Sequence, residues 1–440
     1  MKTSPAKSKF FLTLIIFSLV GQIAWVVENM YFNVFIYKMF HASPADISAM
    51  VMASAVAATV TTLIMGALSD KMGRRKVFMA GGYILWGISI LSFAFIREDT
   101  VGLLFPAASV SAICITLVIV MDCVMTFFGS TANDACFNAW LTDSTTHESR
   151  GAAEGINAMM PLVAILCVFG GFMGFDLNKS ESWTTIFLII GIAVTVIGIV
   201  GFFLIDESDK SRKKADGTDR YFANIVYGFR PSVMKQNPLL YLLLIAFALF
   251  GISIQIFMPY LILYYTEGLK MEGYVLVMAP AIILASVFTV FWGRVHDKVG
   301  FSKSMLPSLG LLCAGYILLY FFRSTALVFV GSLLMMCGYL AGTAVFGAVI
   351  RDYTPEGRAG MFQGLRIAGQ VLIPGLIGPA IGAWVLRDAE TVIGDDGTES
   401  FIPNQNIFLA ALVAAAVLGL FLALLLYIMK KKTAKESAHE

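Results

Sequence analysis

The sequence contains few charged residues. Lys, Arg, Asp and Glu make up 14% of its 440 residues, whereas a soluble domain carries about 25%. A soluble protein of this length would need more charge to cover its surface, so the shortage excludes a soluble enzyme, a nucleic-acid-binding protein and a disordered chain. Hydrophobic residues make up 58%. The composition therefore predicts a membrane protein with several spanning helices.

Cysteine and histidine are also scarce. The six cysteines lie in apolar stretches without the paired spacing of a disulfide framework or a zinc site, which indicates small buried side chains. The four histidines lie in loops or the C-terminal tail, and none has a second ligand at metal-binding spacing. The sequence has no Walker loop and no H-E-x-x-H motif. We therefore expect no metal site, no catalytic residues and no enzymatic activity.

Long apolar runs dominate the chain. A spanning helix needs about 20 mostly apolar residues, and the sequence has twelve such segments. They lie at approximately 10–37, 47–68, 77–96, 117–141, 153–175, 183–205, 238–265, 273–293, 303–322, 325–350, 359–386 and 406–429. We expect an all-α integral membrane protein with twelve transmembrane helices.

The basic residues predict the orientation of these helices. If both termini are cytoplasmic, 24 of the 31 Lys and Arg residues lie in the termini and cytoplasmic loops, and six lie in outer loops. Because basic residues concentrate on the cytoplasmic side, we expect a multi-pass plasma-membrane protein with both termini in the cytoplasm. The first apolar run continues past Trp25 to Tyr37 without a cleavage site, so we expect it to be kept as a span.

The chain contains an internal repeat. The segment Gly66–Lys76 recurs as Gly293–Lys303 with the shared pattern G-x-x-x-D-K-x-G-x-x-K, and residues 132–143 resemble residues 341–352. Loop motifs that recur in order predict two pseudo-symmetric six-helix bundles with a solute site between the repeats. We expect an N-terminal half at 1–205, a cytoplasmic linker at 206–237, and a C-terminal half with a basic tail at 238–440.

The offset between the repeats falls from 227 to 209, so the first half has about 18 extra residues near 98–116. We expect an extension of the fourth helix or a short surface helix there. This register places Asp134 inside the membrane. It places Asp122 about 31 Å from Asp143, at the outer interface, where we expect no functional role.

The first copy of the loop motif resembles the signature loop of the major facilitator superfamily, with the degenerate second copy where that family has its own. The resemblance covers nearly the whole chain, and the long central loop and the polar first and fourth helices resemble those of sugar and glycoside cation symporters. The residues that carry it are Gly66, Leu68, Asp70, Gly73, Arg74, Arg75 and Lys76.

The resemblance implies a conformational latch at the cytoplasmic side. Gly73 permits the tight turn, and the basic residues hold the loop at the lipid headgroups. Asp70 would lock the halves by facing Arg358, and Asp297 would face Arg150. The alternative is a loop that only orients the chain. The latch set is Gly66, Asp70, Gly73, Arg74, Arg75, Arg150, Asp297, Gly300 and Arg358.

Polar residues in the first span predict an ion or solute site. Gln22, Trp25, Asn29 and Asn33 follow an i, i+3, i+7, i+11 spacing and share one face of a regular helix. Glu28 lies at the edge of this face, about 13 Å below the outer end of the span. Ionisable groups in hydrocarbon are costly and usually face a cavity. We expect Glu28 to be a protonatable or cation-coordinating carboxylate; the alternative is a structural hydrogen bond to a neighbouring helix.

Two further spans carry buried charge. Asp134 and Asn138 share a face of the fourth span, and Arg366 shares a stripe with Gln363 and Gln370 in the eleventh. Asp134 and Arg366 lie at matching depths of about 13 and 12 Å, which predicts an ion pair. Alternatively, Arg366 binds an anionic group of the solute, or each residue pairs within its own half.

The seventh span carries candidate solute ligands. Gln255 and Tyr260, with Tyr264 and Tyr265, are placed to hydrogen-bond a hydroxylated solute. Aromatic residues near helix ends serve equally well as interfacial anchors.

Together these features predict a secondary active transporter that works by alternating access. We expect H⁺- or Na⁺-coupled uptake of a sugar-like or other polar solute. The alternatives are an exporter of amphipathic compounds and, from a different class, a transporter-like receptor or a membrane enzyme. The expected partners are a small solute and the lipid bilayer, without nucleic acid or an obligate protein partner. No cofactor is expected beyond the coupling ion.

Overall fold

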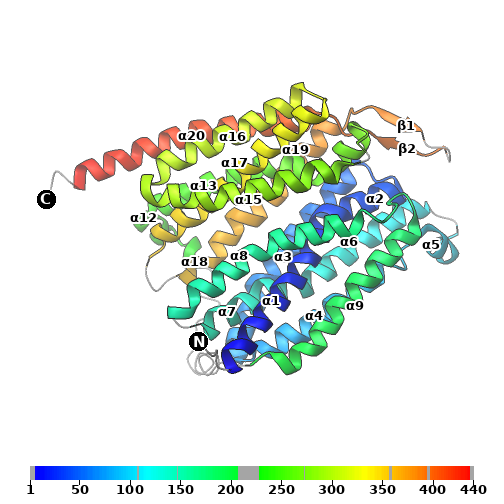
Figure 1. Cartoon of the computed structure of the whole chain (residues 1–440), viewed down its shortest axis with the longest axis horizontal. Coiled ribbons are helices and arrows are strands. Elements are labelled where there is room, and N and C mark those ends of the chain that lie inside the picture. The colour runs from blue at the N-terminus through cyan, green and yellow to red at the C-terminus, as the bar shows by residue number, and fades with distance from the viewer. Residues whose placement is uncertain are drawn as a thin grey trace. The chain divides into compact units, whose positions relative to one another are not determined.

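The computed structural model (Figure 1) describes residues 5–106, 109–145, 147–206, 227–271, 273–355, 359–393 and 397–436. Within these residues, twelve helices are long and apolar enough to cross a membrane, and each overlaps one predicted span. The expected all-α membrane fold is confirmed. The chain divides into two compact units, Met1–Phe222 with Ile393–Ser400, and Ala223–Val392 with Phe401–Glu440. Most of the expected linker lies outside the described residues.

The first unit holds six of the spans. Spans one and four are interrupted by π-helical stretches, in which the backbone bonds follow an i→i+5 pattern. Its helices are α1 (Pro5–Val26), η1 (Val27–Tyr31), α2 (Phe32–Phe40), α3 (Pro44–Met72), α4 (Arg75–Phe93), α5 (Glu98–Leu104), α6 (Val110–Gly129), η2 (Ser130–Phe137), α7 (Asn138–Ser144), α8 (His147–Phe172) and α9 (Ser180–Leu204).

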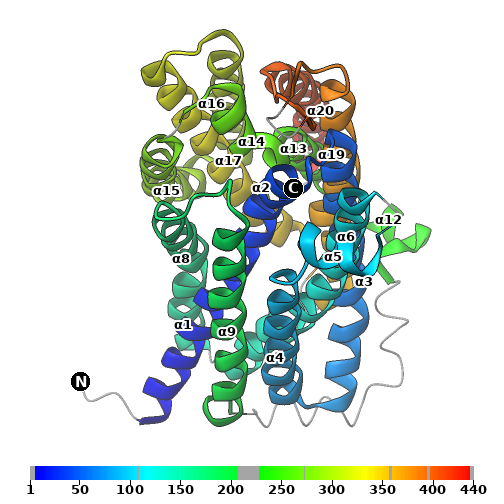
Figure 2. The same ribbon diagram turned by 90° about the vertical axis from the view of Figure 1, so that its right-hand side faces the viewer.

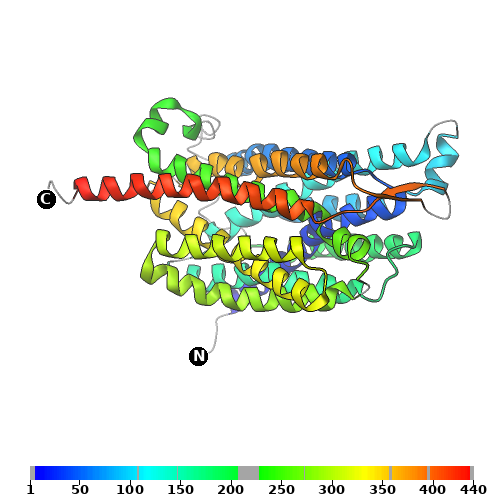
Figure 3. The same ribbon diagram turned by 90° about the horizontal axis from the view of Figure 1, so that it is seen from above.

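The second unit holds the other six spans, and its last helix runs unbroken for 31 residues (Figure 3). Its elements are η3 (Tyr227–Phe229), α12 (Pro231–Gln236), α13 (Pro238–Phe257), η4 (Met258–Tyr260), α14 (Leu261–Leu263), η5 (Tyr264–Gly268), α15 (Tyr274–Val299), α16 (Phe301–Phe321), α17 (Thr325–Tyr353), α18 (Ala359–Ile367), η6 (Ala368–Leu372), α19 (Ile373–Leu386), β1 (Thr391–Ile393), β2 (Glu399–Phe401) and α20 (Asn406–Glu436).

The extra length predicted near 98–116 forms both expected structures. The short helix α5 begins at Glu98, and α6 starts at Val110. Asp122 therefore lies twelve residues inside α6, about 18 Å from its start, and its side chain is only 2% exposed. The helix extends past Asp122 by more than three turns, as expected for an extended fourth helix, and its position at the outer interface stays a prediction.

Glycine allows helices of the first unit to pack at very short distances. α4 and α9 lie side by side (Figure 2). A Cβ atom on Gly87 would lie 2.5 Å from the backbone nitrogen of Thr195 and 2.6 Å from the carbonyl oxygen of Gly191. Because lipid tails are as apolar as the helices, the hydrophobic effect does not drive the helices together. Close van der Waals packing of this kind therefore stabilises the bundle.

The two copies of the loop motif form the expected tight turns. Gly73 ends α3 with a φ of 62°, and Gly300 separates α15 from α16 with a φ of 77°. Both values lie in the left-handed region, which glycine enters without steric cost. The repeated glycine thus has a positive φ in both units, but the turns differ, because ψ is 20° at Gly73 and 177° at Gly300.

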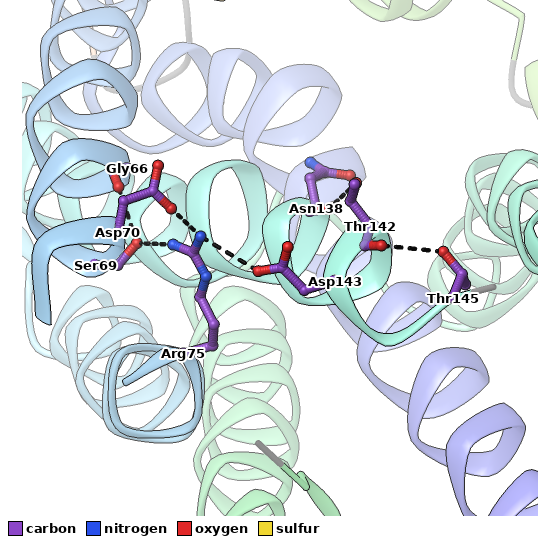
Figure 4. A network of polar contacts seen from close by, with 8 residues as sticks. All are labelled: Gly66, Ser69, Asp70, Arg75, Asn138, Thr142, Asp143 and Thr145. Atoms are coloured by element: carbon purple, nitrogen blue, oxygen red, sulfur yellow. Dashed lines mark hydrogen bonds and ion pairs between the residues drawn. The ribbon is translucent and has the colours of Figure 1, made fainter. Parts of the chain in front are cut away.

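A buried arginine organises the first turn (Figure 4). The Arg75 guanidinium is 2% exposed and donates hydrogen bonds to Ser69 Oγ and Asp70 Oδ1. It also lies 3.5 Å from Asp143 Oδ2 on α7. The next residue back, Arg74, is exposed. The network therefore ties the start of α4 to the end of α3 and to span four.

The other latch residues are less defined. Gly66 accepts a hydrogen bond from Ser69 Oγ at 3.0 Å, and Asp297 is exposed near the end of α15. Arg358 lies outside the described residues, and the side chain of Arg150 is not among those described. The expected pairs Asp70–Arg358 and Asp297–Arg150 stay predictions.

We expect Arg75→Ala to lower the free energy of unfolding by about 3–5 kcal/mol, because it removes the partner of two partly or fully buried carboxylates. The matched variant Arg74→Ala removes an exposed neighbour and should change it by less than about 0.5 kcal/mol. Thermal unfolding of the purified protein in detergent compares the two. An equal loss in both variants would contradict the network.

Candidate functional site

Glu28 lies in a π-helical stretch and is buried against two other helices. It belongs to η1, and its side chain is 6% exposed. Its Oε1 atom lies 2.8 Å from Ser54 Oγ on α3 and 2.8 Å from Thr126 Oγ1 on α6. The two hydroxyls lie 2.9 Å from each other. Three helical elements therefore converge on one carboxyl oxygen.

Asp122 joins this group, although the sequence analysis assigned it no role. It lies one helical turn before Thr126 on α6 and therefore on the same face. It is 2% exposed and interacts electrostatically with Glu28. The signal in the sequence is the spacing of Asp122 and Thr126, two polar residues four apart in an apolar helix. We call Glu28, Asp122, Ser54 and Thr126 the carboxyl cluster.

The carboxyl cluster is not neutralised by a basic residue. Glu28 Oε2 and Asp122 Oδ1 are buried and have no hydrogen-bond partner. Among the described residues, no lysine or arginine forms an ion pair with either carboxyl or with Asp134; the buried ion pairs of this unit are those of Arg75. A buried charge without a partner costs several kcal/mol. The arrangement is thus suited to bind a cation.

A second polar network connects spans one, three and four. The indole of Trp25 donates to Asn133 Oδ1 at 3.4 Å, and Asn133 Nδ2 donates to the Tyr83 hydroxyl at 2.7 Å. Tyr83 in turn donates to the carbonyl oxygen of Phe17 at 2.6 Å. A Cβ atom on Gly21 would clash with both Asn133 and Tyr83. The network fixes the ring of Trp25, whose side chain remains partly exposed.

Asp134 and Asn138 follow Asn133 on the same span. Asp134 lies in η2 and accepts a hydrogen bond from Ser130 Oγ at 2.9 Å. Asn138 is exposed and donates to the carbonyl oxygen of Asp134 at 3.0 Å. Asn29 is exposed on η1 and donates to the carbonyl oxygen of Trp25 at 2.8 Å.

The predicted single polar face of span one is wrong. Asn29 is exposed, whereas Asn33 is 1% exposed and its Oδ1 has no partner. Gln22 is partly exposed. The i, i+3, i+7, i+11 rule assumes a regular α-helix, and the π-helical stretch Val27–Tyr31 adds a residue to one turn. The residues on its two sides therefore turn to different faces.

In the second unit, the aromatic candidates of span seven belong to the interior. Tyr260 is 0% exposed. The hydroxyl of Tyr264 donates to the carbonyl oxygen of Leu319 at 3.2 Å, and that of Tyr265 lies 2.6 Å from Ser332 Oγ. Gln255 is partly exposed. Gln255 is therefore the member of this set whose side chain is not fully buried.

Arg366 lies near the end of α18, just before the π-helical stretch η6, which contains the exposed Gln370. It is partly buried and forms no ion pair or hydrogen bond with the described residues of its unit; the charged group acting on it there is Arg351, a like charge. Pairing within its own unit is therefore not observed. The side chain of Gln363 is not described. The pair of Arg366 with Asp134 stays a prediction.

Comparison with known proteins gives a family and a fold. Residues 10–336 and 275–440 match the Major Facilitator Superfamily. A curated relative, Sugar efflux transporter B of Salmonella typhimurium, is 26% identical over 224 residues, which cover 50% of this chain and 53% of the relative. The chain thus spans about half the length of that relative.

Solved structures agree over nearly the full length. A single-residue variant of the nucleoside transporter NupG has a TM-score of 0.72 at 13% identity and covers 94% of this chain and 98% of its own. The xylose transporter XylE from E. coli has a TM-score of 0.66 at 16% identity, with 95% and 97% covered. These identities show the shared fold alone. With the match along its length and its twelve spans, the chain belongs to the major facilitator superfamily.

Proposed function

We propose that the protein is a secondary active transporter that couples the movement of a small polar solute to a cation, H⁺ or Na⁺. The observation that carries this proposal is the set of three carboxyls inside the spans of the first unit, Glu28, Asp122 and Asp134. None of them has a basic partner among the described residues. A cation bound from one side of the membrane neutralises such a group, and its release on the other side restores the charge.

The proposed solute is sugar-like. The proposed binding surface of the first unit combines the partly exposed ring of Trp25 with amide groups of Asn29 and Asn138 and the carboxyl of Asp134. An aromatic face packs against the apolar side of a pyranose, and amide and carboxyl groups hydrogen-bond hydroxyls. The names of two similar proteins, a sugar efflux transporter and a xylose transporter, support this class.

For the direction, we propose uptake by symport in the plasma membrane, with both termini in the cytoplasm as the basic residues predict. In this orientation, the Arg75 network lies at the cytoplasmic end, where we propose that it stabilises one state of the transport cycle. Cation-coupled efflux is a second candidate, because the curated relative is named as a sugar efflux transporter.

Proteoliposomes with imposed proton or sodium gradients and a panel of labelled sugars test the coupling. We expect an inward cation gradient to drive solute accumulation in the wild type. Glu28→Gln and Asp134→Asn should abolish accumulation but retain solute exchange, because each removes a chargeable group and keeps most of its shape. The matched control Asp99→Asn changes an exposed carboxyl outside the spans and should behave as wild type.

Full gradient-driven accumulation in both intramembrane variants would refute the proposed coupling. Gradient-driven loss of solute from the vesicles would favour efflux. Solute binding without any transport would indicate a receptor.

Replacing Trp25 tests the solute surface. Trp25→Ala removes the aromatic face and should raise the half-saturating solute concentration about tenfold, which corresponds to about 1.4 kcal/mol of lost binding. Trp384→Ala, in a ring 62% exposed on α19, is the matched control and should leave it unchanged. Equal saturation curves for wild type and Trp25→Ala would remove Trp25 from the binding surface.

A further inference from the structure

We infer that Glu28 and Asp122 form a pair that shares one exchangeable proton, held in a ring of hydrogen bonds with Ser54 and Thr126. The inference deepens the proposed function and rests on it for its role in transport: it names the proton as the coupling ion and Asp122 as part of its site. Glu28, Ser54 and Thr126 from η1, α3 and α6 meet at one carboxyl oxygen, and the buried Asp122 lies one helical turn from Thr126 on α6.

The triangle of oxygens around Glu28 has too few hydrogens if the carboxyl is ionised. Glu28 Oε1, Ser54 Oγ and Thr126 Oγ1 form a triangle with sides of 2.8, 2.8 and 2.9 Å, and each side has the length of an O–H···O hydrogen bond. The two hydroxyls supply only two hydrogens. If both donate to Glu28, the oxygens of Ser54 and Thr126 face each other at 2.9 Å with no hydrogen between them.

A third hydrogen on Glu28 Oε1 completes the ring. Glu28 then donates to one hydroxyl, that hydroxyl donates to the other, and the second donates back to Glu28. All three contacts become hydrogen bonds, and the carboxyl is neutral, which removes the cost of a buried charge. The distances therefore fit a protonated carboxyl better than an ionised one.

Because Asp122 lies near Glu28, we assign the proton to both carboxyls and not to Glu28 alone. It is 2% exposed, interacts electrostatically with Glu28, and lies one helical turn before Thr126, whose hydroxyl contacts Glu28. Buried oxygens of both carboxyls, Glu28 Oε2 and Asp122 Oδ1, lack a partner. Two neighbouring carboxyls in a medium of low dielectric do not both ionise at neutral pH, so the first proton belongs to the pair.

Among the described residues no cationic side chain compensates the pair, so the shared proton is what lowers its charge from −2 to −1. The other ionisable groups that act on the pair are the carboxyl of Asp134 on η2 and the thiol of Cys123 on α6. Neither is cationic. This contrasts with the two carboxylates around Arg75, whose charge is compensated by a guanidinium. Loading transfers H⁺ from hydronium to a carboxylate oxygen and releases water, and unloading reverses the step.

Infrared difference spectroscopy of the purified full-length protein tests the pair. We expect a carbonyl stretching band of a protonated carboxyl at neutral pH that shifts in D₂O and disappears in the double variant Glu28→Gln/Asp122→Asn. Each single variant should move the pH at which the band titrates by about one unit or more, because the remaining carboxyl has lost its neighbour. The matched control Asp99→Asn should leave the band unchanged.

Several outcomes would overturn the inference. A band that persists in the double variant places the proton elsewhere. A titration altered by Glu28→Gln but not by Asp122→Asn means that the proton is not shared. Loss of the band when Na⁺ replaces K⁺ at constant pH and ionic strength means that the site binds sodium.

The conservative variants Ser54→Ala and Thr126→Val provide a second route if a carboxamide variant does not fold. Each breaks the ring, so each should shift the frequency of the same band, and an unshifted band in both would refute the ring. The spectra need neither solute nor transport. An altered band with intact coupled transport therefore refutes the proposed coupling, whereas lost coupling with an unaltered band refutes the pair.

Discussion

The constraint on which this structure depends is the absence of water from the hydrocarbon core of the membrane. Every polar group there must be satisfied by the protein itself. The chain meets this demand with helices, whose backbone groups bond internally, and with glycines such as Gly87 that bring helix backbones close together. It restricts most of its charges to the helix ends. The few ionisable groups that remain inside are costly, so their arrangement is the part of the structure that points to function.

Two groups of buried carboxyls, one with an arginine and one without, show how this constraint acts. Around Arg75, opposite charges meet at the end of a span and neutralise one another, which gives a structural network. Around Glu28, two carboxyls lie within the bundle without a basic partner among the described residues. The first arrangement is stable on its own. The second has no counter-charge among the described residues, which is why we propose it as the site of the coupling cation.

Much of the fold followed from the sequence because hydrophobic length is a property of local composition. All twelve spans were predicted on that basis, whereas the extra length near 98–116 was predicted from the offset of the internal repeat and the turn at Gly73 from the loop motif. The first residue of α6, Val110, was not predicted, because the apolar stretch that includes it is longer than one span. The interaction of Asp122 with Glu28 was not predicted either, because it depends on how two helices pack together. Composition also cannot say which of two adjacent arginines turns inward, and the structure buries Arg75 while leaving Arg74 exposed.

The candidate site was predicted only in part for a similar reason. Glu28 and Asp134 were identified because a carboxyl in an apolar run is conspicuous in the sequence. The face they occupy depends on π-helical geometry, which comes from tertiary packing and has no recognisable composition. Ser54 and Thr126 are unremarkable in sequence, since isolated hydroxyl residues are common in spanning helices. They acquire meaning only when three helices bring them to the same carboxyl oxygen.

The π-helical stretch Val27–Tyr31 has a mechanical consequence of its own. It contains one residue more than an α-helical turn. One residue corresponds to a rotation of about 100° around the axis of an α-helix. If the stretch relaxed to α geometry, the outer part of span one would rotate by that amount relative to the inner part. Asn33 would then return to the face of Trp25 and Asn29, and Glu28 would change its angle to α3 and α6. The π-helical stretch thus offsets the two parts of span one by one residue, and Glu28 lies within it.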